Sequence, residues 1–328
     1  MIKVQSREER VVPQQPQSRN PVPAPALALP RTEERNPRTA GIDRVPALEL
    51  LRLLNAEDAT VAAAVERALP VLAEVVERVT ERLRAGGRVH YFGAGTSGRM
   101  AVLDAAEVVP TFGLDSTVFV AHQAGGERAL GTALEDAEDD EARGEADARE
   151  VSAADVAVGV TASGRTPYVA GALRVAGAAG ALTVLVSSNP AAPLAALAEF
   201  RVLTDTGPEA IAGSTRLKAA TAQKMVLNML STAAMVRLGR TYSNLMVSLS
   251  GNNSKLRQRQ VTILREATAA SEQACRRELA RCGGDLRLAL LCLLAGTDPA
   301  AAAAALSGSG GSVRGALERL GGDHHRGP

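Results

Sequence analysis

Residues 88–99 read RVHYFGAGTSGR, a short run of strand-forming residues followed by three closely spaced glycines. The run is typical of a buried strand, and Gly93, Gly95 and Gly98 predict a tight turn into a helix that begins near Gly98. Such a turn directs free backbone N–H groups and a helix N-terminus toward one point, which favours an anion. This stretch therefore predicts a strand–turn–helix unit with an anion site at the turn.

Four further runs of the same kind follow, separated by helical stretches. They are STVFVA at 116–121, DVAVGVTA at 155–162, LTVLVSS at 182–188 and FRVLTD at 200–205. Strands that alternate with helices predict a parallel sheet covered on both faces. The predicted fold class is therefore α/β, a three-layer sandwich around a parallel sheet.

The segments on either side of this alternation have helical spacing of apolar residues. The spacing predicts two or three helices between Pro46 and Gly86, a long helix after Gly213, and several short helices from about Val261 to Leu320. The first 30 residues carry little apolar surface that could offset the entropy of ordering. We expect a disordered leader over 1–30, an α/β domain with its N-terminal helices over 31–255, a helical C-terminal module over 256–320, and a flexible tail over 321–328.

Composition excludes several classes of function. The 328 residues are 46% hydrophobic and 22% charged with a formal net charge of +1, as in ordinary soluble globular proteins. No apolar run approaches the ~18 residues that span a bilayer, and the polar opening lacks the apolar centre of a signal peptide, so we expect a cytoplasmic protein without a membrane partner. Near-zero charge and 2% aromatic residues argue against nucleic acid.

The three cysteines lie close together near the C-terminus, at Cys275, Cys282 and Cys292. Their spacings of seven and ten match neither a CxxC metal knuckle nor a redox pair. We therefore interpret them as buried or idle thiols in a reducing compartment.

Gly93, Gly95 and Gly98 also spell GxGxxG, so a dinucleotide site has to be weighed. Such a site needs an acidic residue at the end of the next strand, where this chain has Ala121-His122-Gln123. A P-loop fails as well, because Arg99 and Met100 stand where Lys and a magnesium-binding hydroxyl are required. The hydroxyls of Thr96 and Ser97 suit a phosphate monoester held without metal, although the same pattern fits a plain tight turn.

A second turn with hydroxyls and a glycine strengthens the phosphate interpretation. The third strand runs into SGRTPY at 163–168, where Pro167 suits the first position of the next helix. Two such turns at the carboxyl ends of parallel strands would face one crevice, the usual ligand position in an open α/β sheet. The leading ligand is therefore a phosphorylated small molecule.

Four long segments carry a resemblance to a known family. GAGTSGRMAVLDAAEVVPTFG, TASGRTPYV, GPEAIAGSTRLKAATAQKMVLNMLST and RLGRTYSNLMV resemble the N-acetylmuramic acid 6-phosphate etherases of the sugar isomerase (SIS) superfamily, and the likeness extends from Thr32 to about Leu320. It implies an SIS domain with a small helical C-terminal module, acting as a homodimer. It also implies cleavage of the D-lactyl ether of N-acetylmuramic acid 6-phosphate to N-acetylglucosamine 6-phosphate and D-lactate.

The chemistry of that reaction needs one base and one acid. Opening the sugar to its aldehyde acidifies the C2 proton, so a base at C2 and an acid at the leaving oxygen permit elimination, and water adds back through the same groups. We expect no metal or redox cofactor. The resemblance implies Glu107 as the proton donor and Glu138 as the second carboxylate, the expected base. Each has an alternative: Glu107 as a solvated helix residue, and Glu138 as part of a solvated acidic run.

We expect further contacts to phosphate or sugar from residues in the matched motifs. They are Thr96, Ser97, Gly98, Arg99, Ser163, Gly164, Thr166, Glu209, Ser214 and Lys218. Arg99 fits a structural cross-link equally well, and Lys218 fits a solvated position on a helix that Ser214 or Thr215 caps. His90 is expected to be a satisfied core residue, and His122 a residue that faces the crevice.

Two alternatives and one assembly remain open. A phosphosugar-sensing regulator resembling the glucokinase regulatory protein, or an SIS aldose–ketose isomerase, would share the phosphate turns; retention of both glutamates favours the etherase. Gly98 and Glu107 are separated by ~13 Å if their helix is regular. We therefore expect sites at the boundary of a homodimer, with the apolar helical surface from Met225 to Met235 as a plausible self-associating face.

Overall fold

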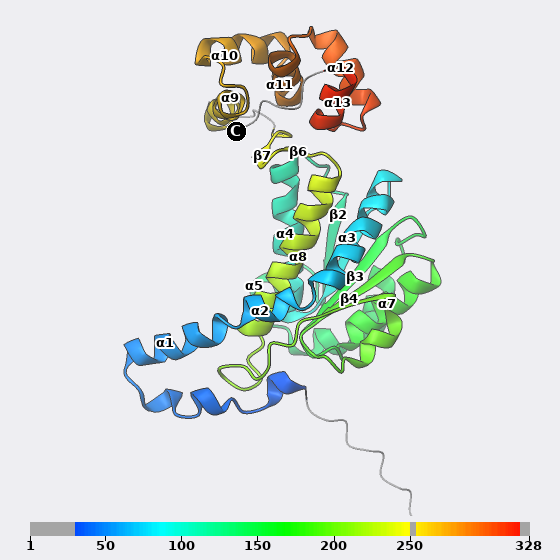
Figure 1. Cartoon of the computed structure of the whole chain (residues 1–328). Coiled ribbons are helices and arrows are strands. Elements are labelled where there is room, and N and C mark those ends of the chain that lie inside the picture. Colours follow the sequence, from blue (N-terminus) through cyan, green and yellow to red (C-terminus); the bar gives the residue numbers. More distant parts are fainter. Residues whose placement is uncertain (1–29, 250–253, 322–328) are drawn as a thin grey trace, which may run out of the picture.

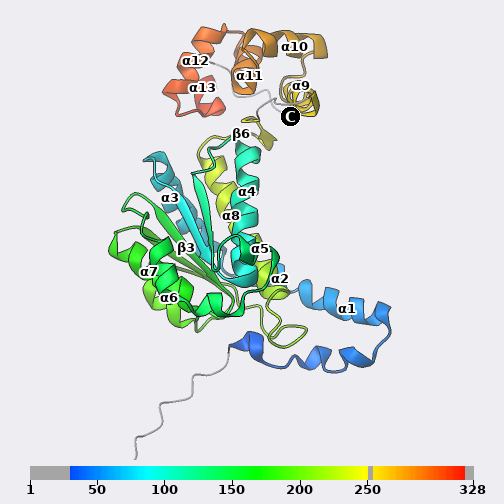
Figure 2. The same ribbon diagram turned by 180° about the vertical axis from the view of Figure 1, so that it is seen from behind.

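The computed structural model describes residues 30–249 and 254–321. The predicted leader, apart from Pro30, and the predicted tail, apart from Gly321, lie outside the described residues. Figures 1 and 2 show an α/β body, a helical arm at its N-terminal side and a separate group of helices at the C-terminal end.

The body contains a five-stranded sheet in the order β2-β1-β3-β4-β5. Its strands are β1 (Val89–Gly93), β2 (Phe119–Gln123), β3 (Val156–Thr161), β4 (Leu182–Ser187) and β5 (Phe200–Leu203). All neighbouring strands pair in parallel. The five predicted strands and the parallel α/β class are therefore confirmed.

Helices cover both faces of this sheet. On one face lie α3 (Leu69–Arg84), α4 (Gly95–Phe112) and α8 (Lys218–Arg237), with α8 in contact with both others. On the other lie α6 (Glu141–Asp147) and α7 (Pro167–Ala178), which pack together. β1, β3 and β4 are buried along their whole length, as expected for strands covered on both faces. The predicted three-layer sandwich is confirmed.

Two helix starts differ from the predictions. α4 begins at Gly95 and not near Gly98, because Ala94 is extended and the glycine turn itself forms the first turn of the helix. α8 begins at Lys218, and neither Ser214 nor Thr215 caps it. The Glu209 carboxylate instead accepts hydrogen bonds from the backbone N–H groups of Lys218 and Ala219, both at 2.9 Å.

The N-terminal arm is a chain of short helices that extends from the body (Figure 1). It comprises η1 (Arg31–Glu33), η2 (Pro37–Thr39), η3 (Ile42–Arg44), α1 (Ala47–Asp58) and α2 (Val61–Glu66). An ionic cluster attaches it to α8. The Lys218 ammonium lies 2.8 Å from Glu57, and Arg38 donates to the same carboxylate at 2.7 Å. Both the Lys218 and Glu57 side chains are almost fully buried, at 0% and 3% exposed.

Glu57→Gln is expected to cost about 3–5 kcal/mol of stability at pH 7, because it leaves the buried Lys218 ammonium without its anion. The hydrogen bond from Arg38 comes first among the causes that lower the pKa of Glu57 to about 2. A lowered pKa means that the contribution is present above about pH 4.5 and is lost as pH falls toward 2. Denaturant unfolding at pH 7 and pH 2.5 should therefore show a smaller difference between wild type and variant at the lower pH.

The matched control is Glu77→Gln, which removes an ion pair with Arg237. The side chain of Glu77 is 51% exposed and that of Arg237 is 57% exposed. Its cost should stay within about 0.5 kcal/mol at both pH values. A Glu57→Gln variant no less stable than Glu77→Gln would contradict the assigned role of the cluster.

The C-terminal module has its own apolar core. After the short β6–β7 hairpin (Thr241–Tyr242 and Leu245–Met246) it contains α9 (Ser254–Thr268), α10 (Glu272–Arg281), α11 (Leu286–Ala295), α12 (Pro299–Gly308) and α13 (Val313–Arg319). All three cysteines are buried in it as free thiols, as predicted. Across the described residues, no single helix is long and apolar enough to cross a membrane, although α11 and α12, bent by 108°, meet the length and composition criteria as a pair.

Candidate functional site

The order of the strands places the carboxyl ends of β1 and β3 next to each other. These two strands are neighbours, with Gly93 opposite Val160. The helices that follow them, α4 and α7, pack on opposite faces of the sheet (Figures 1 and 2). The point at which successive connections diverge to opposite faces is where open α/β sheets bind ligands. The two turns singled out in the sequence follow these two adjacent strand ends.

The first turn presents free hydroxyls and a helix N-terminus. Thr96 is half-buried and Ser97 is 9% exposed, and in the part of the chain that the structure describes neither hydroxyl has a hydrogen-bond partner. Gly98 lies so close to Gln123 that any side chain at 98 would collide with the Gln123 carboxamide. The glycine therefore allows the start of α4 to lie against the end of β2.

The second turn is held by hydrogen bonds of its own. The Thr161 hydroxyl lies 2.8 Å from that of Thr166 and accepts a hydrogen bond from the Gly164 N–H. The Ser163 hydroxyl accepts one from the Arg165 N–H. Gly164 has a φ of +68°, and a side chain there would collide with Ala192. Pro167 lies in the first turn of α7, as predicted.

Residues at the end of β4 and just after it, which were not selected from the sequence, support this turn. The Asn189 side chain donates to the Ser163 carbonyl at 2.7 Å, and the Ser187 hydroxyl donates to the Ala162 carbonyl at 3.2 Å. The sequence signal was another hydroxyl-rich strand end, SSN at 187–189, on a strand next to β3. These residues fix the backbone on which Ser163 and Thr166 are presented.

A cavity of about 200 Å³ opens beside the first turn. Its lining includes Gly95, Arg99 and Gln123 together with Glu138, which lies on the 3-10 helix η4 (Glu135–Asp139). Other members of the acidic run have different roles: Asp140 caps α6, and Glu141 pairs with Arg174 at 2.5 Å. The structure thus brings Glu138 to the same cavity as Gly95 and Arg99, although 39 residues (138 − 99) separate it from Arg99.

The cavity shifts the proton affinity of Glu138. Glu138 is exposed overall, but partial loss of water around its carboxyl group, with the nearby charge of Asp139 as a second cause, raises the pKa of Glu138 above its ordinary value. A carboxylate with a raised pKa is a stronger base and is closer to the range useful for proton transfer near neutral pH.

Arg99 forms a structural cross-link, which is the alternative role considered for it above. Its guanidinium donates to the carbonyls of Ala129, Leu130 and Thr132, at 2.7–3.2 Å, and so attaches α4 to α5 (Arg128–Gly131). It also lines the cavity. Arg99 therefore shapes the wall that carries Glu138.

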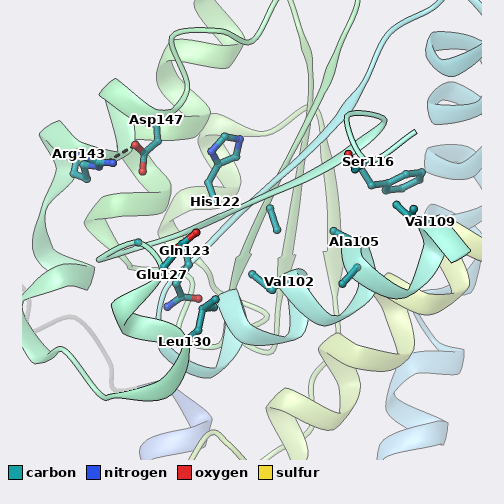
Figure 3. A pocket seen from close by; sticks show the side chains of 14 residues that line it. Val102, Ala105, Val109, Ser116, His122, Gln123, Glu127, Leu130, Arg143 and Asp147 are labelled. Atoms are coloured by element: carbon teal, nitrogen blue, oxygen red, sulfur yellow. Dashed lines mark ion pairs between the residues drawn. The ribbon is translucent and has the colours of Figure 1, made fainter. Parts of the chain in front are cut away.

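Glu107 lies elsewhere on the same subunit. It is exposed on α4, ten residues after Ser97, which corresponds to ~15 Å along a regular helix. Its neighbours Ala105, Ala106 and Val109 line a different cavity, of about 540 Å³, between α4, β2 and α6 (Figure 3). Among the described residues, neither of these two cavities is lined by both Glu107 and Glu138.

His122 lines this second cavity, and His90 is in contact with His122. The Nδ1 atom of His90 is 3.0 Å from Nε2 of His122, and the His122 ring stacks on Phe92 at 4.5 Å. Burial lowers the pKa of His90 to about 4 and also lowers that of His122. His90 is buried in the core, as expected, but its Nε2 has no partner among the described residues, so it is not a satisfied histidine. Figure 3 shows His122 beside the Arg143–Asp147 ion pair.

The structure gives Glu209 and Lys218 a role different from the expected contact with substrate. Both are 0% exposed. Glu209 caps α8 through backbone N–H groups, and Lys218 pairs with Glu57, so neither side chain has surface left for a ligand in this chain. We therefore replace direct contact with a positioning role: the two residues hold the loop that carries Ser214, which stays half-buried.

The predicted self-associating face over Met225–Met235 is only partly accessible in the structure. Within Met225–Met235 the side chains of Val226, Leu227, Leu230 and Met235 belong to the core. Met229 stays exposed, at 37%, and lines an apolar groove with Leu69, Leu72 and Val76 of α3. The accessible apolar surface is therefore a groove between α3 and α8, not the whole face of α8.

Known proteins resemble this chain in sequence and in structure. Residues 71–177 match the family described as the glucokinase regulatory protein N-terminal SIS domain. An N-acetylmuramic acid 6-phosphate etherase of Thermobifida fusca (strain YX) is 58% identical over 80% of this chain and 86% of its own length. One of Actinobacillus pleuropneumoniae serotype 5b (strain L20) is 46% identical over 89% and 97%. A phosphoheptose isomerase structure from Francisella tularensis, 13% identical, covers 58% of this chain and 100% of its own with a TM-score of 0.45. The chain belongs to the N-acetylmuramic acid 6-phosphate etherase family.

Proposed function

We propose that this protein cleaves the D-lactyl ether of N-acetylmuramic acid 6-phosphate, giving N-acetylglucosamine 6-phosphate and D-lactate in the recycling of cell-wall amino sugars. The observation that carries the proposal is the cavity in which Glu138 lies beside the first hydroxyl turn. The relatives, 46–58% identical over most of the chain, are etherases by name, and favour this reaction over a sensor or an isomerase.

In this mechanism the two turns hold the phosphate. Hydroxyls and backbone N–H groups at the starts of α4 and α7 donate hydrogen bonds to an anion, and both helix dipoles favour it. Thr96, Ser97, Ser163 and Thr166 supply the hydroxyls, while Gly98 and Gly164 allow the close approach of the backbone. The phosphate then fixes the sugar so that its C2 faces Glu138.

The chemical steps use two carboxylates. Glu138 takes the C2 proton of the open-chain aldehyde, and the resulting enolate expels the lactyl oxygen from C3. Glu107 donates a proton to this oxygen, so that D-lactate leaves with a hydroxyl group. Water adds to C3 of the unsaturated aldehyde, and the proton returns to C2. The raised pKa of Glu138 suits a group that must both accept and return a proton near neutral pH.

We further propose that the competent unit is a homodimer, in which Glu107 of one protomer completes the site of its partner. Glu107 is exposed and remote from the Glu138 cavity within one chain. The cavity between α4, β2 and α6 and the apolar groove between α3 and α8 are surfaces that a second copy can cover. The partner must cover the surface that lets Glu107 of one protomer reach the Glu138 cavity of the other.

The test is direct. Pure protein is incubated with N-acetylmuramic acid 6-phosphate, and D-lactate is assayed enzymatically. Release of D-lactate from the phosphorylated sugar, with little from unphosphorylated N-acetylmuramic acid, is expected. Binding of the sugar phosphate without any D-lactate would instead support the sensor, and an interconverted sugar phosphate without D-lactate would support the isomerase.

Ser97→Ala and Ser163→Ala should each raise KM about 10- to 100-fold, since a hydrogen bond to a charged group contributes ~1.5–3 kcal/mol. Initial rates against substrate concentration give KM and kcat separately. Thr262→Ala, on the surface of α9, is the control and should leave both unchanged. Equal KM values for all three variants would remove the two turns from the phosphate site.

A further inference from the structure

Three potential metal ligands meet inside the C-terminal module. Glu278 and Cys282 come from the end of α10, and Cys292 comes from α11; the three are 9%, 8% and 5% exposed. The two sulfur atoms lie 3.9 Å apart, and Cys282 Sγ lies 3.9 Å from Glu278 Oε1. All three ligand atoms are within 4.8 Å of one another.

The local fold explains this meeting. Glu278 and Cys282 are four residues apart and so lie on one face of a helix end. The turn that follows contains Gly283 and Gly284 at φ +62° and +85°, which reverses the chain and lays α11 against α10. Cys292 then faces the end of α10. This cluster belongs to a core separate from that of the α/β body, and the proposed reaction does not use it.

The spacing matches a tetrahedral metal site. With metal–sulfur bonds of ~2.3 Å and metal–oxygen bonds of ~2.0 Å, tetrahedral angles place two sulfurs ~3.8 Å apart and a sulfur and an oxygen ~3.5 Å apart. The observed sulfur–sulfur separation of 3.9 Å is close to the first value, and the observed sulfur–oxygen separation of 3.9 Å is about 0.4 Å longer than the second. A disulfide needs its sulfurs ~2.05 Å apart, so its formation requires the two helices or their side chains to move together.

The charges of the cluster also favour a cation. Of the two Glu278 oxygens, Oε2 pairs with Arg281 at 3.0 Å, and Oε1 faces Cys282. Arg281 pairs with one oxygen of this buried carboxylate, and a divalent cation bound to Oε1 and the two sulfurs would give the carboxylate a second positive partner.

We propose that Glu278, Cys282 and Cys292 form a structural site for one thiophilic divalent cation, of which Zn²⁺ is the type, clamping α10 to α11. Two thiolates select a soft or borderline metal over Mg²⁺ or Ca²⁺, and a carboxylate is a common third ligand for zinc. Three protein ligands leave one position for water. The proposal is independent of the etherase reaction and assigns the metal no part in it.

The test is a titration of the metal-free, reduced full chain with Co²⁺ and then Zn²⁺. His324 and His325 are also metal-binding residue types, so the titration is made with His324→Ala/His325→Ala as background. One Co²⁺ per chain should bind, with sulfur-to-cobalt charge-transfer absorption in the near ultraviolet and the intense visible bands of a tetrahedral site. Zn²⁺ should displace it and raise the unfolding temperature.

Cys275→Ser is the matched control, because Cys275 is buried in the same module but its Sγ faces the Ala270 carbonyl. It should keep the spectrum and the stoichiometry. Cys282→Ser and Cys292→Ser should each weaken Zn²⁺ binding at least ~100-fold, since each removes a thiolate ligand. Charge-transfer absorption absent from the parent chain, or equal in all three serine variants, would overturn the proposal. So would a parent chain whose mass is 2 Da lower after air oxidation through a Cys282–Cys292 disulfide and which binds no Co²⁺ when reduced.

Discussion

Replacing Glu138 by Gln is expected to lower kcat at least ~100-fold, the usual contribution of a general base, with substrate binding retained. The amide keeps the size of the side chain but cannot take the C2 proton. Steady-state kinetics, with substrate affinity measured separately by calorimetry, distinguishes this loss from misfolding. Glu107→Gln should show a loss of the same order, since it removes the acid at the leaving oxygen.

The acidic run supplies its own control. Glu141→Gln changes a carboxylate three residues away that pairs with Arg174 at the surface, and it should keep kcat within about twofold. The raised pKa of Glu138 also has a sign that can be tested. A base must be ionised, so activity falls as pH drops through this pKa, and Asp139→Asn should move that limb to lower pH. Equal losses in Glu138→Gln and Glu141→Gln would contradict the assignment.

Mixing inactive Glu138→Gln protomers with inactive Glu107→Gln protomers is expected to restore activity. In a shared site, each mixed dimer has one intact site and one site that lacks both carboxylates. Random exchange makes half of the dimers mixed, so about a quarter of the wild-type activity should return. The exchange is verified by mass tags on the two variants.

The control repeats the exchange with the double variant Glu107→Gln/Glu138→Gln and each single variant, where no intact site can form. Activity there should stay at the level of the single variants. Exchange that is complete yet leaves the Glu138→Gln and Glu107→Gln mixture equally inactive would mean that each site is built within one chain.

The fold could be predicted from the sequence because its signals are local. Five strand-forming runs alternate with helical stretches, and both glycine turns stand at strand ends, so the parallel sheet follows from known rules of connection. Helix starts were less predictable. Ser214 and Thr215 are good local capping residues, but the Glu209 carboxylate caps α8 from the loop that follows β5.

Residues of the candidate site could be predicted only where a single strand end and its turn carry the signal. Ser97 and Ser163 could be chosen from their turns, whereas the support from Asn189 depends on the pairing of β3 with β4. Lys218 was expected to contact the substrate or to be solvated, because its partner, Glu57, lies 161 residues away on the arm. The group formed by Glu278, Cys282 and Cys292 was not predicted for a similar reason. A reversal of the chain brings Cys292 to Cys282, and their spacing in the sequence does not match a CxxC metal motif.

The central claim, elimination through an enolate, is tested most directly by running the reaction in D₂O and analysing the product by NMR. If Glu138 removes the C2 proton and a solvent-exchanged proton returns, N-acetylglucosamine 6-phosphate should carry deuterium at C2, in step with the release of D-lactate. Product that forms with D-lactate but keeps its original hydrogen at C2 would contradict the enolate route and the role of Glu138.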